Sequence, residues 1–220
     1  MMPNHSNATR PPHHTHPGFG AAAGDGYRLC EHSGQERDAV EHFIHERFKE
    51  SYGAHLASFM PRLFSLNSED DHIVAGFGLR EAAHESLFLE RYLPSPVEAC
   101  IAKHLGRPVH RENIVEVGHF AGLSAGDTRV MIRALTQCLF REGFHWVCFT
   151  GTTTLRNAFR RLALDPIELA RAERYHLGKA ELGLWGNYYD NDPRVLFGNV
   201  TEGYAALLNT ADNSGSHTHE

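Results

Sequence analysis

The fold is decided by residues 114–149, IVEVGHFAGLSAGDTRVMIRALTQCLFREGFHWVCF, which predict two strands joined by a helix. Ile114–Phe120 is rich in β-branched residues and predicts a strand. Thr128–Glu142 has an apolar stripe at helical spacing, formed by Val130, Met131, Ala134, Leu135, Cys138 and Leu139. Trp146–Phe149 is a continuous apolar run, typical of a strand that is covered on both faces. A strand, a helix and a strand in this order indicate a parallel pair with a crossover helix.

The segments on either side of this unit predict an α/β domain with a mixed sheet flanked by helices. Expected strands are Tyr27–Glu31, the hairpin Arg62–Leu66 and Ile73–Leu79, and Ile167–Leu169. Expected helices are Glu36–Tyr52, Ser95–Leu105 and Thr153–Leu162. For the second of these, Ser95 is the expected N-cap and Glu98 completes a capping box.

Composition and length indicate one globular domain with unstructured ends. The chain has 220 residues, of which 41% are hydrophobic and 22% charged. Residues 1–26 and 209–220 are poor in large apolar groups and predict disordered tails, which leaves residues 27–208 as the domain. The net charge of −6 argues against a nucleic-acid-binding protein.

The cysteines and histidines predict neither disulfides nor a metal site. The four cysteines (Cys30, Cys100, Cys138 and Cys148) lack the spacing of a zinc or redox motif, so reduced thiols are expected. Seventeen histidines are present, but six lie in the two tails, where a solvated polar segment is the simpler interpretation. The sequence contains neither a signal peptide nor an apolar run long enough for a transmembrane segment, so a cytoplasmic protein is expected.

Three motifs carry a resemblance to a known family. They are IVEVGHFA (114–121), GFHWVCFTGTTTLRNAFRRLALDPIEL (143–169) and WGNYYDNDPRVLFGNV (185–200). Together they resemble the thermostable hemolysin family, over roughly residues 27–208. The order of elements resembles the GNAT acyltransferase fold, whose mixed sheet is split between its two central strands. Glu116, followed three residues later by His119 and then by Phe120, is similar to a Glu followed by Arg-Phe in acyl-homoserine-lactone synthases.

The resemblance implies an acyl transfer from a thioester to an amine, and three residues are candidates for its catalysis. Glu116 lies on an apolar strand, where a carboxylate either finds a partner or has a raised pKa that suits a general base. His119 is a candidate base or hydrogen-bonding partner, although a lone histidine is more often structural. Phe159 stands where many GNAT enzymes have a catalytic tyrosine. Tyr188 is therefore the candidate that serves the leaving thiolate, unless it only covers the sheet edge, and Tyr189 remains its alternative.

A second group of residues is a candidate site for acyl-CoA or acyl-carrier-protein thioester. It comprises Gly122, Leu123, Ser124, Ala125, Gly126, Thr128, Thr150 and Asn157. The turn from 122 to 128 opens the crossover helix, where GNAT enzymes bind the pyrophosphate of coenzyme A on backbone N–H groups. Asp127 would repel a phosphate, and it is equally an ordinary helix cap. Thr150 and Asn157 lie where the strands are expected to separate.

Three functions remain open from the sequence. The first is an acyltransferase with a small amine acceptor. An acyl carrier protein is its possible partner, docking on Arg156, Arg160 and Arg161 unless these only form a solvated helix face. The second is a membrane-lytic protein, as the family name says, although the best inserting segment, Leu87–Leu93 with the helix after it, is short. The third is a non-catalytic relative that binds acyl thioesters or a protein partner.

Overall fold

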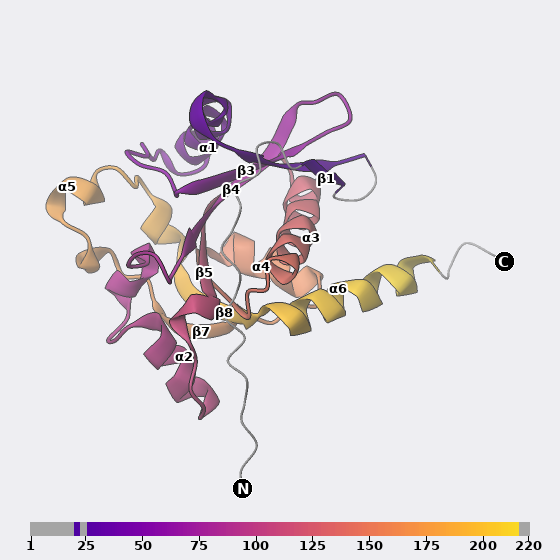
Figure 1. Ribbon diagram of the computed structural model, residues 1–220. Helices are drawn as coiled ribbons and strands as arrows, with labels where there is room; N and C mark the ends of the chain where they lie inside the picture. Colours follow the sequence, from indigo (N-terminus) through magenta and orange to yellow (C-terminus); the bar gives the residue numbers. More distant parts are fainter. Residues whose placement is uncertain (1–19, 23–25, 216–220) are drawn as a thin grey trace, which may run out of the picture.

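The computed structural model describes residues 20–22 and 26–215, and it has the predicted α/β architecture (Figure 1). The strands are β1 Gly20–Ala22, β2 Arg28–His32, β3 Arg62–Asn67, β4 Ile73–Glu81, β5 Ile114–Gly122, β6 Trp146–Gly151, β7 Ile167–Arg171 and β8 Arg194–Asn199. The helices are α1 Arg37–Tyr52, α2 Val97–Leu105, α3 Ala125–Arg141, α4 Thr153–Arg161, α5 Lys179–Leu182 and α6 Val200–Gly215. Among the short 3-10 helices, η2 (Phe88–Tyr92) contributes to the site.

The strands form one mixed sheet in the order β1-β2-β3-β4-β5-β6-β8-β7. Strands β5 and β6 are parallel, as the strand–helix–strand pattern predicts, and the other neighbouring pairs are antiparallel. Strand β8 inserts between β6 and β7, and neither β8 nor α6 was predicted. This insertion gives β6 an antiparallel neighbour on the side away from β5.

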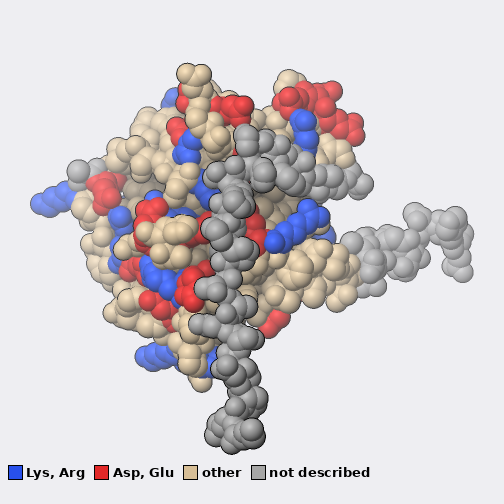
Figure 2. All heavy atoms as spheres, in the orientation of Figure 1, with Lys and Arg blue, Asp and Glu red and all other residues tan. Residues whose placement is uncertain are grey.

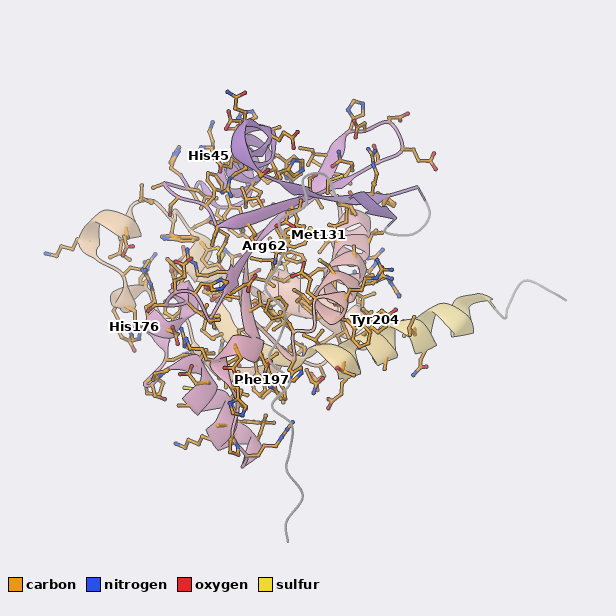
Figure 3. All side chains as sticks on the ribbon, viewed as in Figure 1. His45, Arg62, Met131, His176, Phe197 and Tyr204 are labelled. Carbon is orange, nitrogen blue, oxygen red and sulfur yellow. The ribbon has the colours of Figure 1, made fainter. Side chains whose placement is uncertain are left out.

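The two faces of the sheet carry different helices (Figure 1). Helices α3, α4 and α6 bury side chains such as Met131, Phe159 and Leu207 against one face. Helices α1 and α2 cover the other face, α1 near its middle and α2 over β6 and β8, where Phe197 is buried. Figure 3 shows Met131 on α3 and Phe197 on the side of α2. Since α3 connects β5 to β6, its packing fixes the two central strands relative to each other.

Two helix starts differ from the prediction. Helix α2 begins at Val97, and Ser95 does not cap it. The Val97 N–H instead donates to Glu90 Oε1 at 2.9 Å, while Glu98 binds Arg111 at 2.7 Å. Helix α3 begins at Ala125 rather than Thr128, and its N-cap is Ser124. In both places a neighbouring oxygen acceptor satisfies the helix N-terminus better than the residue predicted from sequence spacing.

The ends of the domain extend into ranges predicted as tails. Strand β1 pairs with β2, and α6 continues as helix to Gly215, past the predicted boundary at 208. Residues 1–19, 23–25 and 216–220 of the predicted tails lie outside the described residues. The boundaries of the domain therefore stay a prediction, with helix found where residues 209–215 were expected to be disordered.

The surface in Figure 2 shows acidic and basic side chains interspersed rather than separated into two faces. Within residues 20–22 and 26–215, no helix has the length and apolarity that crossing a bilayer requires. The segment predicted as the best inserting element belongs to the core instead. Leu87, Leu89 and Tyr92 are buried together with Val97 and Ile101 of α2.

Candidate active site

The central strands separate at their carboxyl ends. Residues Ile114–Val117 of β5 pair with Trp146–Phe149 of β6. Beyond these pairs, β5 continues beside β4 alone and β6 beside β8 alone. A cavity of about 740 Å³ opens at this separation and continues between the sheet and the helices. The sequence predicted this split, and eight of the eleven predicted site residues line the cavity: Glu116, His119, Gly122, Ala125, Thr128, Thr150, Asn157 and Tyr188.

Glu116 is a buried carboxylate on β5, with 2% of its surface exposed. Its Oε2 accepts the N–H of Phe88 at 2.8 Å, and its Oε1 accepts the N–H of Leu89 at 3.0 Å. Burial raises the pKa of Glu116 to about 7, against the lowering effect of these bonds and of the Arg80 charge. Glu116 therefore combines the two alternatives from the sequence, since it has partners and still has a raised pKa. It can exchange a proton near neutral pH.

His119 lies in a bulge of β5. Gly78 pairs with Gly118 and Gly76 with Ala121, so that two residues of β5 oppose only Phe77 on β4. His119 takes a φ of 54°, a left-handed conformation that is uncommon outside glycine and is enriched at functional sites. A bulge at this point redirects side chains next to the cavity.

The protonation of His119 follows from its contacts. Its Nδ1 accepts the backbone N–H of Met60 at 3.3 Å, so in the neutral ring the hydrogen is on Nε2. Burial lowers the pKa of His119 to about 4, and the positive charge of Arg80 lowers it further. The imidazole is therefore neutral at physiological pH. In this geometry His119 offers a hydrogen-bond donor to a ligand, and it is poorly placed to act as a base.

Tyr188 and Thr150 lie on the β6 side of the split. The Tyr188 hydroxyl is 3.4 Å from the carbonyl oxygen of Thr150 and donates to it. Burial raises the pKa of Tyr188 well above its usual range, so its hydroxyl stays protonated. Thr150 Oγ1 is buried and has no hydrogen-bond partner among the described residues. The Thr150 hydroxyl can therefore donate to a ligand at the end of β6, whereas the Tyr188 hydroxyl can do so only if it gives up its long bond to the Thr150 carbonyl.

The turn before α3 leads into a helix N-terminus, where an anion can bind to free backbone N–H groups. Some of these N–H groups already have acceptors within the chain. The Leu123 N–H donates to Val74 at 2.9 Å, and the Asp127 N–H donates to Ser124 Oγ at 3.1 Å. Ser124 in turn donates to the Asp127 carboxylate at 2.6 Å. Leu123, Ser124 and Gly126 lie on the turn but do not line the cavity, and Leu123 is 52% exposed. Ala125, Thr128 and Arg129 line the cavity at this turn, and the Thr128 N–H donates to the Ser124 carbonyl at 3.0 Å.

A second part of the cavity is apolar and lies between the sheet and α3, α4 and α6. Its lining includes Leu135, Leu139, Phe149, Phe159, Leu164 and Ala206. Phe159 stacks on Phe149 with ring centroids 4.7 Å apart. Phe159 thus forms part of an apolar wall. Such a compartment suits a hydrocarbon chain.

Comparison with known proteins identifies the family. A family model described as thermostable hemolysin matches residues 30–204. The chain belongs to the thermostable hemolysin family. No curated protein matches the chain. The family assignment from the three sequence motifs is thus confirmed, and it includes β5, the turn before α3 and the strand β8 that was not predicted.

The chain is similar in structure to several solved acyltransferases. FeeM, an N-acyl amino acid synthase from uncultured soil microbes, is 15% identical with a TM-score of 0.56, over 84% of this chain and 99% of its own. The acyl-homoserine-lactone synthase LasI is 12% identical with a TM-score of 0.55, over 82% and 93%. The CoA-dependent acyl-homoserine lactone synthase BjaI is 16% identical with a TM-score of 0.51, over 81% and 83%. These likenesses confirm the GNAT-type fold.

Sequence analysis missed Arg80, which lies beside Glu116 in the cavity. Arg80 is directly opposite Glu116 in the pairing of β4 with β5, so the two side chains share a face of the sheet. The alternation Gly76, Gly78, Arg80 was the available signal, because glycines on one face of a strand mark a close approach. A Cβ on Gly78 would meet Met60 Cβ at 2.4 Å. In the described residues, no group of three or more His, Cys, Asp or Glu side chains is arranged to hold a metal ion.

Proposed function

We propose that this member of the thermostable hemolysin family is an acyltransferase that moves an acyl group from an acyl-CoA or acyl-carrier-protein thioester to an amine. The main support for this proposal is the cavity at the strand split. The buried carboxylate of Glu116, with a pKa of about 7, and an apolar compartment both line this cavity. A thioester carbonyl at the split would have its chain among α3, α4 and α6. A donor of this kind would place the reaction in the cytoplasm, as the sequence predicts.

Glu116 is the proposed general base. The neutral amine attacks the thioester carbon, an N–C bond forms and the C–S bond breaks, and one proton of the amine passes to Glu116. The ordinary pKa of a thiol, about 8.5, exceeds the pKa of Glu116, so the leaving thiolate can take up that proton. The reaction therefore ends with a free thiol, an amide and an unprotonated Glu116.

His119 and Tyr188 have supporting roles in this proposal. The Nε2–H of His119 is the proposed donor to the carbonyl oxygen on which negative charge develops. Tyr188 is the proposed hydrogen-bond donor to the sulfur, in exchange for its 3.4 Å bond to the carbonyl oxygen of Thr150. Full transfer of the Tyr188 proton to a thiolate would be uphill, because burial holds the pKa of Tyr188 far above that of a thiol. This refines the role proposed from the sequence, in which Tyr188 gives its proton to the thiolate.

The donor's phosphates are proposed to bind at the start of α3, and Thr150 and Asn157 to contact the donor beside the split. The dipole of α3 favours an anion at Ala125 and Thr128, and Arg129 adds a positive charge at the rim. Docking of an acyl carrier protein on α4 has narrower support. Arg156 binds Asp192 at 2.9 Å and the carbonyl of Gly151 at 3.1 Å, which leaves Arg160 and Arg161 for an acidic partner.

The test is thioester binding and turnover by the purified full-length protein. Acyl-CoAs of increasing chain length are added with a mixture of primary amines, and amide products and free thiol are followed by mass spectrometry. Each methylene that enters the apolar compartment should tighten donor binding by about 0.8 kcal/mol, roughly fourfold. Gly126→Val should weaken CoA binding while the protein stays folded, because the added side chain crowds the start of α3.

Two rival functions have distinct outcomes in the same experiment. Thioester binding without any amide product favours a non-catalytic binder. Lysis of red cells by protein that shows no response to thioesters favours a membrane-lytic protein. Calorimetry that detects no thioester of any length, together with no product, contradicts the acyltransferase proposal.

A further inference from the structure

Three buried polar side-chain atoms have no hydrogen-bond partner in the described part of the chain. They are Arg47 Nε, Arg80 Nε and Thr150 Oγ1. The residues that carry them come from α1, β4 and β6, which are distant in sequence, yet all three residues line the same cavity. Unpaired buried donors are uncommon in folded proteins and destabilise them, so a cluster of them around one cavity indicates a polar ligand.

Arg80 is the most informative of the three because of its position. In the described structure its Nε forms an ion pair with Glu85 Oε2 at 3.6 Å, which is too long for a hydrogen bond. The side chain of Glu85 is 48% exposed. The Arg80 side chain itself is only 21% exposed. Glu116, directly opposite, turns both carboxylate oxygens to the backbone of Phe88 and Leu89. The guanidinium charge of Arg80 therefore lines the cavity with a weakly held counter-ion.

We propose that the amine acceptor carries its own carboxylate, as an amino acid does, and that Arg80 binds this carboxylate. The inference rests on the proposed acyl transfer and specifies the class of its acceptor. Cβ atoms of directly opposed residues are about 4.5–5.5 Å apart. Arg80 and Glu116 can thus contact two groups that are separated by a single carbon, the carboxylate and the amine of an α-amino acid.

The charges of such an acceptor match the two residues. Arginine binds a carboxylate with two parallel N–H donors. The Nε of Arg80 is one such donor: within the described residues it makes no hydrogen bond, and Glu85 Oε2 lies 3.6 Å away. The amine then lies beside Glu116, which takes its proton as the N–C bond forms and the C–S bond breaks. The carboxylate of the acceptor is unchanged in the reaction. An amine without a carboxylate would leave Arg80 with only its 3.6 Å ion pair to Glu85.

The inference is tested by competition between matched acceptors. The full-length protein is given one acyl-CoA with a mixture of the L-amino acids and a mixture of their carboxamides, and products are identified by mass. For the best amino acid, kcat/KM is compared with that of its carboxamide. The carboxylate form should be preferred by about tenfold to a hundredfold, the range for a charge-assisted hydrogen bond. Equal use of the carboxamide, or acylation of simple amines alone, overturns the proposal.

Variants of Arg80 show whether this residue is the source of the preference. Arg80→Gln should reduce the ratio of the two kcat/KM values towards one, and Arg80→Lys should restore part of it. Arg171→Gln is the control, because Arg171 lies on β7 and does not line the cavity, and its side chain is 64% exposed. It should retain the ratio. Circular dichroism melting confirms that each variant is folded. An Arg80→Gln protein that is folded and keeps the full preference overturns the assignment.

A binding measurement separates this inference from the proposed reaction. The best-bound amino acid and its carboxamide are titrated calorimetrically into wild type and Arg80→Gln without any thioester. Carboxylate-dependent binding that disappears in the variant supports an acceptor site at Arg80, even if no thioester is turned over and the acyl-transfer proposal fails. Turnover of a thioester without carboxylate-dependent binding or selectivity leaves acyl transfer intact and overturns the role of Arg80.

Discussion

Glu116 and Glu90 are two carboxylates that hold the same short segment, and their pKa values move in opposite directions. Glu116 accepts the N–H groups of Phe88 and Leu89, and Glu90 accepts those of Leu87 and Val97. Burial raises the pKa of Glu116 to about 7. Burial also opposes the charge on Glu90, but hydrogen bonds from Arg111, Val97 and Leu87 outweigh it and lower the pKa to about 2.

The difference lies in the arginine that accompanies each carboxylate. Arg111 contacts Glu90 directly, with a distance of 2.6 Å, and also binds Glu98. Arg80 is opposite Glu116 but makes its ion pair with Glu85. Two backbone N–H bonds thus hold a buried carboxylate in place without fixing its charge, whereas a direct ion pair fixes both. Of the two residues, only Glu116 lines the large cavity.

The largest expected effect is on turnover. Glu116→Gln removes the proton acceptor, so turnover should fall by about 10² to 10⁴-fold with little change in thioester binding. Glu90→Gln is the control. Glu90 also binds backbone N–H groups of segment 87–97, but it does not line the cavity. Its turnover should stay close to that of the wild type. Equal losses in the two variants would mean that both act through the fold of segment 87–97, and Glu116 would no longer be the base.

The second prediction concerns the free energy of unfolding. Glu116→Gln and Glu90→Gln should differ less in this quantity than in turnover. A glutamine offers one acceptor oxygen and one NH₂ group, so each substitution leaves a backbone N–H without its acceptor. Each should lower the free energy of unfolding by about 1–3 kcal/mol. Glu90→Gln also removes the charge that Arg111 binds, so its loss should be the larger. Chemical denaturation at one pH measures both, and a more stable Glu90→Gln protein would contradict the ion-pair assignment.

The two carboxylates should also give opposite pH dependences. Glu116 must lose its proton to act as the base, so kcat/KM, calculated on the concentration of neutral amine, should rise about tenfold per pH unit up to about pH 7 and then level off. The stability that Glu116 contributes should fall between about pH 4.5 and 7, because the folded state holds its proton longer than the unfolded state does. Glu90 has the reverse sign, since its contribution is complete above about pH 4.5 and is lost as the pH falls towards 2.

Denaturation at several pH values measures these slopes. Glu116→Gln should remove the decline between pH 4.5 and 7, and Glu90→Gln should remove the loss below pH 4.5. A kcat/KM profile that is flat from pH 5 to 8 would contradict the raised pKa of the base, provided that the protein remains folded over this range.

The difference between the two carboxylates is only partly visible in the sequence. Periodicity in residues 114–149 was sufficient to predict β5, α3 and β6 and their parallel pairing, because each element follows the previous one directly. It also placed Glu116 on an apolar strand. The contacts that decide the charge of Glu116 come from Phe88 and Leu89, 28 and 27 residues earlier, and from a register between β4 and β5 that no local pattern encodes.

The same limit explains the elements that were missed. Strand β8 follows β7 after a long segment of short helices, which includes α5, and it pairs with β6 as well as β7. Its sequence, RVLFGN, is short and contains a glycine, so a strand was not evident. The start of α2 was misassigned because Glu90, a residue outside the helix, satisfies the N–H of Val97. At these positions, contacts between residues distant in sequence determine the local structure. The local pattern alone therefore gave a wrong or incomplete prediction.

The smallest expected effect concerns Thr150, whose situation is the converse of that of Glu116. Glu116 has two hydrogen-bond partners, whereas the buried Thr150 Oγ1 has none within residues 20–22 and 26–215. Thr150→Val keeps the shape and replaces the unpaired hydroxyl with a methyl group. The free protein should become more stable, by about 1 kcal/mol, because an unpaired polar group is no longer buried. If the hydroxyl donates a hydrogen bond to the thioester or the acceptor, the same variant should bind that ligand several-fold more weakly.

Thr152→Val is the neighbouring control, since Thr152 is also buried, at 5% exposure, but precedes α4 as its N-cap residue. A melting temperature that falls in Thr150→Val while ligand affinity is unchanged would show that the hydroxyl serves the fold instead of a ligand.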